Sequence, residues 1–234
     1  MIENSILLCT FNEGKYVKET VSNLEKNIPN LEIIIVDDNS SDDTISILNN
    51  LDAKSSLKII KRTKTRSLGS AFQRALIESQ GANIGWLDTN MGDLASKFPE
   101  MISELNSYDL VLLSRYVQNG SDDRVFIRAF CSKLINFFCR LVLSSKIRDY
   151  TSSIFIMKRS VLNESVLLGY GHGEFFIEFL YSVIKKNFKI KEIPYKQKKD
   201  DDIENTNTSP NLLRFFFLGF FYFTRVLITR FRRY

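Results

Sequence analysis

The feature that most constrains the fold is a series of short apolar segments that alternate with helical patterns along the first half of the chain. The apolar segments are residues 5–11, 31–40, 57–62, 82–88 and 108–115, and the helical patterns cover 14–27, 42–51, 69–79 and 98–105. Strands this apolar, interleaved with helices, fit a mostly parallel sheet that is covered on both faces. We therefore predict an α/β fold, Rossmann-like and doubly wound.

Polar clusters follow four of these expected strands, and they are "TFNEG", "DDNSSDDT", "TRSLGS" and "DTNMGD". Taken singly, each is explained by turns and helix N-caps, and Asp42 or Asp43 is expected to cap the helix that begins at "TISIL". In a doubly wound sheet, however, ligands bind beyond the carboxyl ends of the strands. Four clusters at the same edge of one sheet therefore favour a binding site.

Two common nucleotide-binding motifs are absent from the sequence. No GxGxxG follows the first strand and no GxxxxGK[ST] occurs, which argues against a dinucleotide-binding site and a P-loop enzyme. The second half of the chain predicts a helix over 124–143, a loop and strand over 147–162, a helix over 173–186 and a strand over 188–195. Residues 196–211 have no apolar periodicity and are expected to form a loop.

The motifs "CTFNE", "VDDNSSDDT", "LGSAFQRALIESQGANIGWLDTN", "SRY" and "DYTSS" occur in an order that resembles family-2 inverting glycosyltransferases, within residues 4–200. The similarity is greatest to the dolichol-phosphate mannosyltransferase-like branch. The resemblance implies the GT-A fold and inverting transfer of a sugar from GDP-mannose or a UDP-sugar to a dolichyl or undecaprenyl phosphate. A glycan or another lipid is an alternative acceptor, and a silent paralogue that partners another transferase at the membrane is an alternative role.

The resemblance also implies roles for individual residues. The nucleotide-sugar side would hold Thr10, Asn12, Glu13, Asp37 or Asp38, Arg62 and the turn with Gly69. Asp88 and Asn90 would hold a divalent metal ion, Mg²⁺ or Mn²⁺, on the donor diphosphate. Arg115 and Arg128 match basic positions that receive the acceptor phosphate, and guanidinium groups suit this role because they bind phosphate in a bidentate manner. The acceptor side would also hold Asp149, Ser152, Lys198 and Lys199.

Three departures from the family pattern bear on activity. Asn90 stands where a second acid is usual, and Ser153 stands where the family commonly has glycine. The usual basic loop is matched only loosely, with Lys198 and Lys199 as its cations. An amide oxygen can coordinate Mg²⁺ or Mn²⁺ but adds no charge. We interpret "DTN" as a working variant with a weaker metal site.

The last 24 residues carry the excess positive charge of the chain. Residues 211–234 contain five arginines and no acid, and without them the 32 basic residues fall to 27, which equals the number of acidic residues. This pattern favours contact of the end of the chain with an anionic membrane and argues against a nucleic-acid protein. The run "FFFLGFFYF" is too short to span a bilayer.

We therefore expect a domain over 1–210 and an amphipathic membrane-interface helix over 211–234, with Arg214, Arg225 and Arg232 on one face toward lipid headgroups. The alternative is a helix packed on the body of the protein or in a dimer. The expected location is the cytoplasmic face of a membrane, peripheral or monotopic. Cys9, Cys131 and Cys139 lie in apolar contexts and are expected to be buried and reduced.

Overall fold

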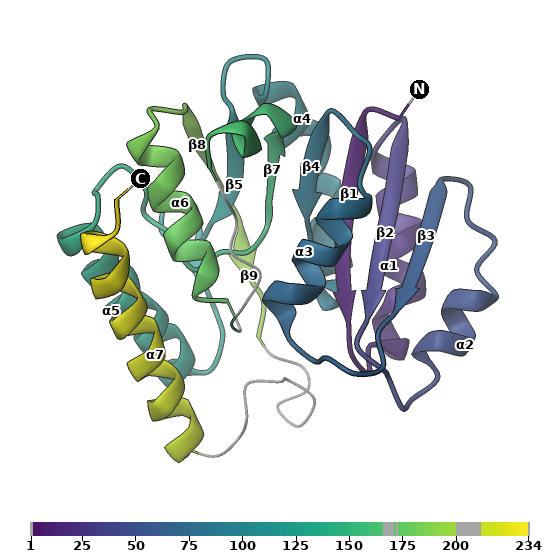
Figure 1. Ribbon diagram of the computed structural model, residues 1–234, viewed down its shortest axis with the longest axis horizontal. Helices are drawn as coiled ribbons and strands as arrows, with labels where there is room; N and C mark the ends of the chain where they lie inside the picture. Colours follow the sequence, from purple (N-terminus) through teal and green to yellow (C-terminus); the bar gives the residue numbers. More distant parts are fainter. Residues whose placement is uncertain (1, 166–170, 172, 200–211, 234) are drawn as a thin grey trace.

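The computed structural model describes residues 2–165, 171, 173–199 and 212–233, with 212–218 described by their backbone alone (Figure 1). Its strands are β1 (Asn4–Thr10), β2 (Leu31–Asp37), β3 (Ser56–Lys61), β4 (Asn83–Trp86), β5 (Leu110–Ser114), β6 (Ser121–Asp122), β7 (Phe155–Lys158), β8 (Ile190–Pro194) and β9 (Lys196–Gln197). Its α-helices are α1 (Gly14–Asn27), α2 (Thr44–Asn49), α3 (Leu68–Glu78), α4 (Phe98–Glu104), α5 (Phe126–Val142), α6 (Phe175–Lys185) and α7 (Leu212–Phe231). The 3₁₀ segments are η1 (Thr89–Lys97) and η2 (Arg159–Asn163).

Seven strands form one mostly parallel sheet in the order β3-β2-β1-β4-β7-β5-β8. All neighbouring pairs are parallel except those of β7, which runs antiparallel to both β4 and β5. The predicted α/β fold with a mostly parallel sheet is confirmed. The two-residue strands β6 and β9 form a separate small ladder, so the expected loop after residue 195 begins with a strand, while its residues 200–211 lie outside the described residues.

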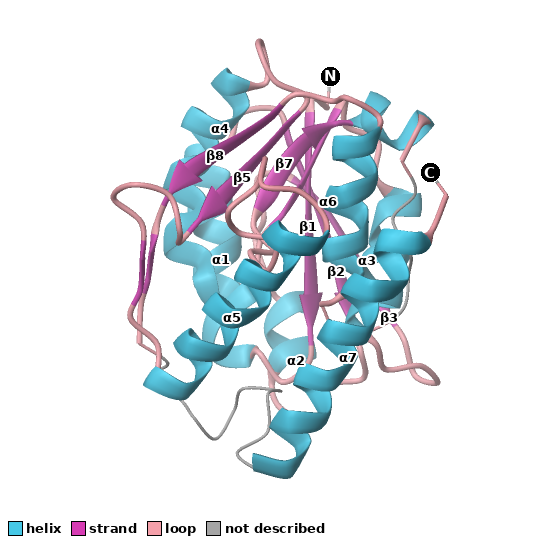
Figure 2. Cartoon of the chain, turned by 90° about the vertical axis from the view of Figure 1, so that its left-hand side faces the viewer, coloured by secondary structure: helices cyan, strands magenta, loops and turns pink. Residues whose placement is uncertain are grey.

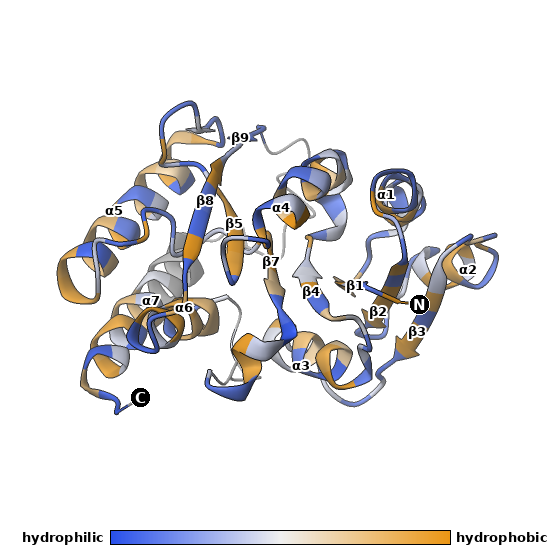
Figure 3. Cartoon of the chain, turned by 90° about the horizontal axis from the view of Figure 1, so that it is seen from above, coloured by the Kyte–Doolittle hydropathy of each residue, from blue (hydrophilic) through white to orange (hydrophobic). Residues whose placement is uncertain are grey.

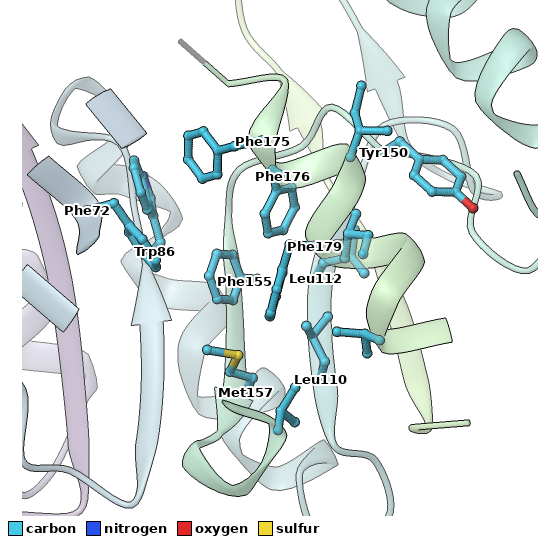
Figure 4. Packing of buried hydrophobic residues seen from close by; sticks show 14 of the residues in the cluster. Phe72, Trp86, Leu110, Leu112, Tyr150, Phe155, Met157, Phe175, Phe176 and Phe179 are labelled. Atoms are coloured by element: carbon cyan, nitrogen blue, oxygen red, sulfur yellow. The ribbon is translucent and has the colours of Figure 1, made fainter. Parts of the chain in front are cut away.

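The sheet is apolar because helices cover both of its faces (Figure 3). Every residue of β2 and β5 is buried. One face packs against α1, α2 and α4 through side chains such as Val17, Leu48 and Phe98. The other face packs against α3, α5, α6 and α7, where Phe72, Trp86, Phe155 and Phe176 belong to one aromatic cluster (Figure 4). Burial of such side chains contributes about 1.5–3 kcal/mol each.

The C-terminal helix α7 packs on the protein and lies beside α5 (Figure 2). Val226 is fully buried, and the Phe223 ring lies 4.9 Å from that of Phe138 on α5. Arg225 donates to Glu178 of α6 at 3.0 Å, and Arg232 pairs with the same carboxylate. The expectation that Arg225 and Arg232 share a helical face is right, but that face meets α6 and not lipid headgroups. The Arg214 side chain lies outside the described residues.

The three cysteines are free. Cys139 is buried, as expected, whereas Cys9 and Cys131 are only partly buried. Burial, followed by the charges of Asp38 and Asp88, raises the pKa of Cys9 well above its usual value. Cys9 therefore stays protonated near neutral pH and is a poor nucleophile.

Candidate active site

A cleft of about 1340 Å³ opens at the carboxyl ends of the central strands, where the sequence predicts the ligand site. Residues from the ends of β1, β2, β4 and β5 line it, together with the start of α5 and the chain after β9. The predicted site residues that line this cleft are Thr10, Asn12, Glu13, Asp38, Asp88, Asn90, Arg115, Arg128, Ser152, Lys198 and Lys199. Those that do not line it are Asp37, Arg62, Gly69 and Asp149.

The turns after β1 and β2 are joined by side-chain hydrogen bonds. Asn12 adopts the left-handed conformation with φ of 56°, which asparagine tolerates better than most residues. Its side-chain oxygen accepts the backbone N–H of Ser41 at 2.8 Å. Asp37 is fully buried beneath these turns, where it accepts Thr10 Oγ1 at 3.0 Å and the backbone N–H of Ser40 at 2.9 Å. Asp37 therefore shapes the turn, while the following residue reaches the cleft.

Asp38 is held from the side of β3. The Arg62 guanidinium donates to both of its carboxylate oxygens, at 2.6 and 2.7 Å, and the backbone N–H of Ser67 donates at 3.0 Å. Arg62 also donates to the carbonyl oxygen of Ser67 at 3.0 Å. Arg62 thus braces Asp38 and the turn that leads into α3. Gly69, expected in a turn, lies in the first turn of α3 and donates its backbone N–H to the carbonyl of Gly171 at 3.2 Å.

Glu13 lies at the start of α1 with its side chain lining the cleft. Its backbone N–H donates to Thr44 Oγ1 at 2.9 Å, and the neighbouring Asp42 accepts the backbone N–H groups of Gly14 and Thr44, each at 3.1 Å. Asp42 thus satisfies the first N–H of α2, although Asp43 is the N-cap residue. Burial, and then the charges of Asp88 and Asp42, raise the pKa of Glu13 to about 7.

Asp88 stands two residues beyond β4 and faces the cleft. The Trp86 indole N–H donates to its Oδ1 at 3.0 Å, and the Ser153 hydroxyl donates to its Oδ2 at 2.8 Å. Asn90 is exposed in η1 and lines the same cleft. The strand end therefore presents one oriented carboxylate and one amide.

The donor set at residues 88 and 90 fits a hard divalent cation. Each Asp88 oxygen accepts one hydrogen bond and keeps a lone pair, and the Asn90 amide oxygen is a further hard ligand. Among the described residues, no three His, Cys, Asp or Glu side chains gather closely enough to hold a metal ion by themselves. A bound Mg²⁺ or Mn²⁺ would therefore need further oxygen ligands from a substrate and water, as is usual for Mg²⁺.

Arg115, at the end of β5, is buried in a network of partners. Asp149 accepts its backbone N–H at 3.0 Å, and its guanidinium donates to both Asp149 oxygens at 2.8 Å and to Thr151 Oγ1 at 2.7 Å. Asp122 lies 3.5 Å from another of its nitrogens. Although burial opposes it, the charge and hydrogen bonds of Asp149 raise the pKa of Arg115 well above its usual value. This arginine stays charged and joins β5 to the 149–151 loop.

The first turn of α5 and the segment after β9 complete the basic side of the cleft. Arg124 and Arg128 line it, and Arg124 donates to Asp122 at 2.7 and 2.8 Å. Burial opposes ionisation of Asp122, but Arg124 and then Arg115 lower its pKa to about 2. Lys198 pairs with Asp93 at 2.7 Å across the mouth of the cleft.

Sequence reasoning missed three residues of the site. Arg124 stands two residues before α5, and Arg66 stacks on the Phe11 ring in the cleft, with its guanidinium carbon 3.3 Å from the ring centroid. Ser153 was noted only as a departure from glycine. The position of Arg66 directly before the "SLGS" turn was a usable signal, whereas the contact between Ser153 and Asp88 depends on strand pairing.

The family model for "Glycosyl transferase family 2" matches residues 5–166, which is more than half of the chain. The chain belongs to glycosyl transferase family 2. The match ends in the segment before α6, so it covers the strand-end turns, Asp88 and the loop that holds Asp149 and Ser153.

Two similar curated proteins have names that refer to polyprenyl phosphates. A dolichol-phosphate mannosyltransferase of Pyrococcus furiosus is 29% identical over 197 residues, which are 82% of this chain and 55% of that protein. A dodecaprenyl-phosphate galacturonate synthase of Rhizobium johnstonii is 25% identical over 177 residues, 73% of this chain and 52% of that protein. The chain spans about half the length of the curated relatives it matches.

The solved structures confirm the predicted GT-A fold. Glucosyl-3-phosphoglycerate synthase from Mycobacterium tuberculosis, in complex with Mn²⁺, UDP-glucose and phosphoglyceric acid, superposes with a TM-score of 0.73. The superposition covers 98% of this chain and 80% of that chain at 15% identity. At this identity the likeness establishes the fold alone.

Proposed function

We propose that this chain is a sugar transferase that uses a nucleotide-diphosphate sugar as donor and a polyprenyl phosphate as acceptor. The observation that carries the proposal is the charge separation within one cleft. Glu13, Asp38 and Asp88 lie beyond the ends of β1, β2 and β4, respectively, while Arg124 and Arg128 lie at the start of α5. Family membership and the two relatives named for polyprenyl-phosphate products support the same reading.

The two ends of the cleft suit different parts of the two substrates. On the acidic side, Thr10, Asn12 and Asp38 offer hydrogen-bond acceptors to the base and ribose of a nucleotide, near the braced Arg62 and the turn with Gly69. On the basic side, Arg128, Lys198 and Lys199, next to the buried Ser152, offer donors to a phosphate group. Asp149 acts indirectly, because it holds Arg115 in place at the floor of the cleft.

The chemistry needs positioning more than proton transfer. A phosphate monoester oxygen is already ionised near neutral pH, so it can attack the anomeric carbon of the sugar without a strong general base. The new carbon–oxygen bond forms on the face opposite the leaving group, and the bond to the diphosphate breaks, so the configuration inverts. Arg115 and Arg128 would reduce the repulsion between the two anions as they approach.

A divalent ion, Mg²⁺ or Mn²⁺, is part of the proposal. When bound at Asp88 and Asn90 it would neutralise charge that develops on the departing diphosphate. The complex of the mycobacterial synthase contains Mn²⁺ together with UDP-glucose, which supports a metal in this fold. In this chain Trp86 and Ser153 orient the carboxylate that would contact the ion.

The proposed acceptor is a lipid, and we propose that the chain reaches it at an anionic membrane surface, on its cytoplasmic face. No helix among the described residues is both long and apolar enough to cross a membrane. The large exposed apolar side chains on and next to α5 and α7 are Val125, Phe126, Ile127, Phe130, Leu134, Phe137, Leu141, Phe220, Phe221, Leu227, Ile228 and Phe231. These two helices lie side by side, and α5 begins at the cleft.

The exposed face of α5 and α7 also carries cations. Lys133 and Arg140 are exposed on α5, and Arg230 is exposed on α7. Basic residues near anionic lipid contribute about 1 kcal/mol each, and the apolar side chains add a contribution that salt does not screen. The proposed membrane-binding surface therefore includes α5 as well as the helix expected within 211–234.

The function is tested with purified protein, Mn²⁺, a panel of nucleotide sugars and a short polyprenyl phosphate, with lipid-linked sugar as the readout. We expect one donor to give product and omission of the metal to abolish it. Product on a glycan acceptor alone would contradict the lipid acceptor. Failure of every donor, together with tight binding to another transferase, would indicate the silent-partner role.

Liposome flotation tests the membrane surface. Phe126 and Phe130 are stacked on the exposed side of α5 and have little packing to lose, so the double substitution Phe126→Ser with Phe130→Ser should lower the bound fraction without unfolding the domain. The matched control is Ile77→Ser, at an equally exposed apolar residue of α3. Equal flotation of the double variant and the control would contradict the membrane role of α5.

A further inference from the structure

The pairing of β4 with β7 brings Ser153 to Asp88. The two strands are antiparallel with Trp86 opposite Phe155, so two steps onward along β4 correspond to two steps back along β7. Asp88 and Ser153 therefore face each other just past the last recorded pair. Because side chains alternate between the faces of a strand, both lie on the same face as Trp86 and Phe155.

The Asp88 carboxylate is held at both oxygens by this arrangement. The Trp86 indole N–H donates to Oδ1 and the Ser153 hydroxyl donates to Oδ2. Trp86 is itself fixed, since its ring stacks on Phe72 at 4.2 Å and is 2% exposed. Two donors on two oxygens set the plane of the carboxylate as well as its direction.

The backbone around Ser153 is anchored equally well. The carbonyl of Ile154 accepts the backbone N–H of Leu113 at 2.9 Å, which fixes the chain directly after Ser153 to β5. On the other side, Asp149 is fully buried against Arg115. The hydroxyl of Ser153 thus approaches Asp88 from a rigid loop, and that loop also carries the proposed acceptor residues.

We propose that Ser153 is a positioning residue that orients Asp88 for the divalent ion and so compensates for the missing charge at Asn90. The inference rests on the proposed function, because it concerns the ion of that same site. A glycine at this position has no side chain and could not supply the hydrogen bond. In this chain the two protein ligands, one carboxylate and one amide, carry less negative charge than a pair of carboxylates. The orientation of the Asp88 carboxylate therefore matters more for binding of the ion. Outer-shell hydrogen bonds of this kind typically change metal affinity by about 10–100-fold.

The single tryptophan of the chain gives a direct readout. Trp86 provides one indole N–H signal in a nitrogen–proton NMR spectrum, and that proton is bonded to Asp88. Titration with Mg²⁺ should shift this signal, and the midpoint of the shift measures ion binding without any turnover. Each titration is run with excess UDP and again with excess GDP.

We expect Ser153→Ala to raise the Mg²⁺ midpoint about tenfold. Ser153→Thr keeps the hydroxyl and should restore a midpoint close to that of the unaltered chain. The matched control is Ser160→Ala, at an exposed serine of η2 outside the cleft.

The outcomes separate this inference from the proposed function. An equal midpoint, or a lower one, in Ser153→Ala would overturn the positioning role while leaving the metal site intact. Loss of binding in Ser153→Thr as well as Ser153→Ala would mean that the loop and not the hydroxyl matters, which also overturns it. If the indole signal of the unaltered chain does not respond to Mg²⁺ with either nucleotide, the metal site of the proposed function is wrong and the role of Ser153 falls with it.

Discussion

The two sides of the cleft use the same kind of ion pair in different settings. On the proposed donor side, Arg62 holds Asp38 beside the turn that leads into α3, and the two side chains are 13% and 7% exposed. On the acceptor side, Arg115 holds Asp149 in the interior, with exposures of 3% and 0%. The proposed donor side is built from turns that follow parallel strands, whereas the proposed acceptor side joins the end of β5 to the loop before the antiparallel strand β7. The first pair places a carboxylate at the wall of the cleft, whereas the second keeps its carboxylate outside the cleft lining, where it holds the fold together.

The largest expected effect is on the donor side, at Asp88. Asp88→Ala removes the oriented carboxylate from the end of β4 and should lower transfer by about 10³-fold, because the charge on the departing diphosphate is then poorly compensated. Asp88 is only partly buried and lies beyond the end of the strand, so the melting temperature should change little. Initial rates and thermal unfolding are measured beside Asp52→Ala, an exposed control outside the cleft. Near-normal turnover would refute the assignment of Asp88.

On the acceptor side, the second prediction concerns stability. Arg115→Ala leaves the Asp149 carboxylate buried without its main partner, so we expect the free energy of unfolding to fall by about 3–5 kcal/mol. Denaturant unfolding measures this change. Arg128→Ala is the comparison, because Arg128 lines the same cleft but is only partly buried, so this variant should lose activity with little loss of stability. Equal stability of the two variants would mean that the Arg115–Asp149 pair does not hold the fold together, and the contrast with the Arg62–Asp38 pair would be wrong.

The difference between the two sides explains which parts of the molecule were predictable from the sequence. The strands were predictable because strands of a sheet covered on both faces are mostly apolar, as in β2, where only Glu32 and Asp37 are polar. The donor-side residues were predictable because turns after parallel strands meet at one edge, which brings Asn12, Asp38 and Asp88 together.

The proposed acceptor side was harder to predict from the sequence because its contacts depend on the order of the strands in the sheet. The sequence predicts a loop and a strand over 147–162 but not that the strand, β7, is inserted antiparallel between β4 and β5. That insertion alone places Ser153 against Asp88. Charge patterning also misled the interpretation of α7, because Arg225 looked like a headgroup ligand but lies buried against Glu178. A pattern of residue types does not show which partner a helix face meets.

The third prediction uses the raised pKa of Glu13, which is about 7 in the folded chain against an ordinary value of 4.5. Burial is the main cause, so the charged form is disfavoured in the folded state. Between these two values the folded chain binds more protons than the unfolded chain, and the free energy of unfolding therefore falls as pH rises from about 4.5 to about 7. Above about pH 7 the free energy of unfolding falls no further from this cause.

Glu13→Gln should remove this decrease in the free energy of unfolding, because glutamine does not ionise. We expect the variant to gain about 1–3 kcal/mol relative to the unaltered chain at pH 8, and no gain at pH 4. Denaturant unfolding at several pH values measures the difference. The same substitution on the acceptor side, at Glu192, gives a comparison, since burial raises the pKa of that carboxyl too. A gain for Glu13→Gln that does not vary with pH would mean that packing and not ionisation is responsible.

The smallest expected effect concerns the proposed donor side alone, at Asn90. Asn90 is exposed beside Asp88, so Asn90→Asp adds a charge at the proposed ion without disturbing the core. Because carboxylate charge strengthens the binding of hard cations, the Mg²⁺ or Mn²⁺ concentration for half-maximal activity should fall by roughly threefold to tenfold. Asn90→Ala removes the amide ligand and should move the midpoint in the opposite direction. If the midpoint is the same in all three proteins, residue 90 does not contact the ion, and Asp88 with its two hydrogen-bond donors provides the protein's whole contribution to the site.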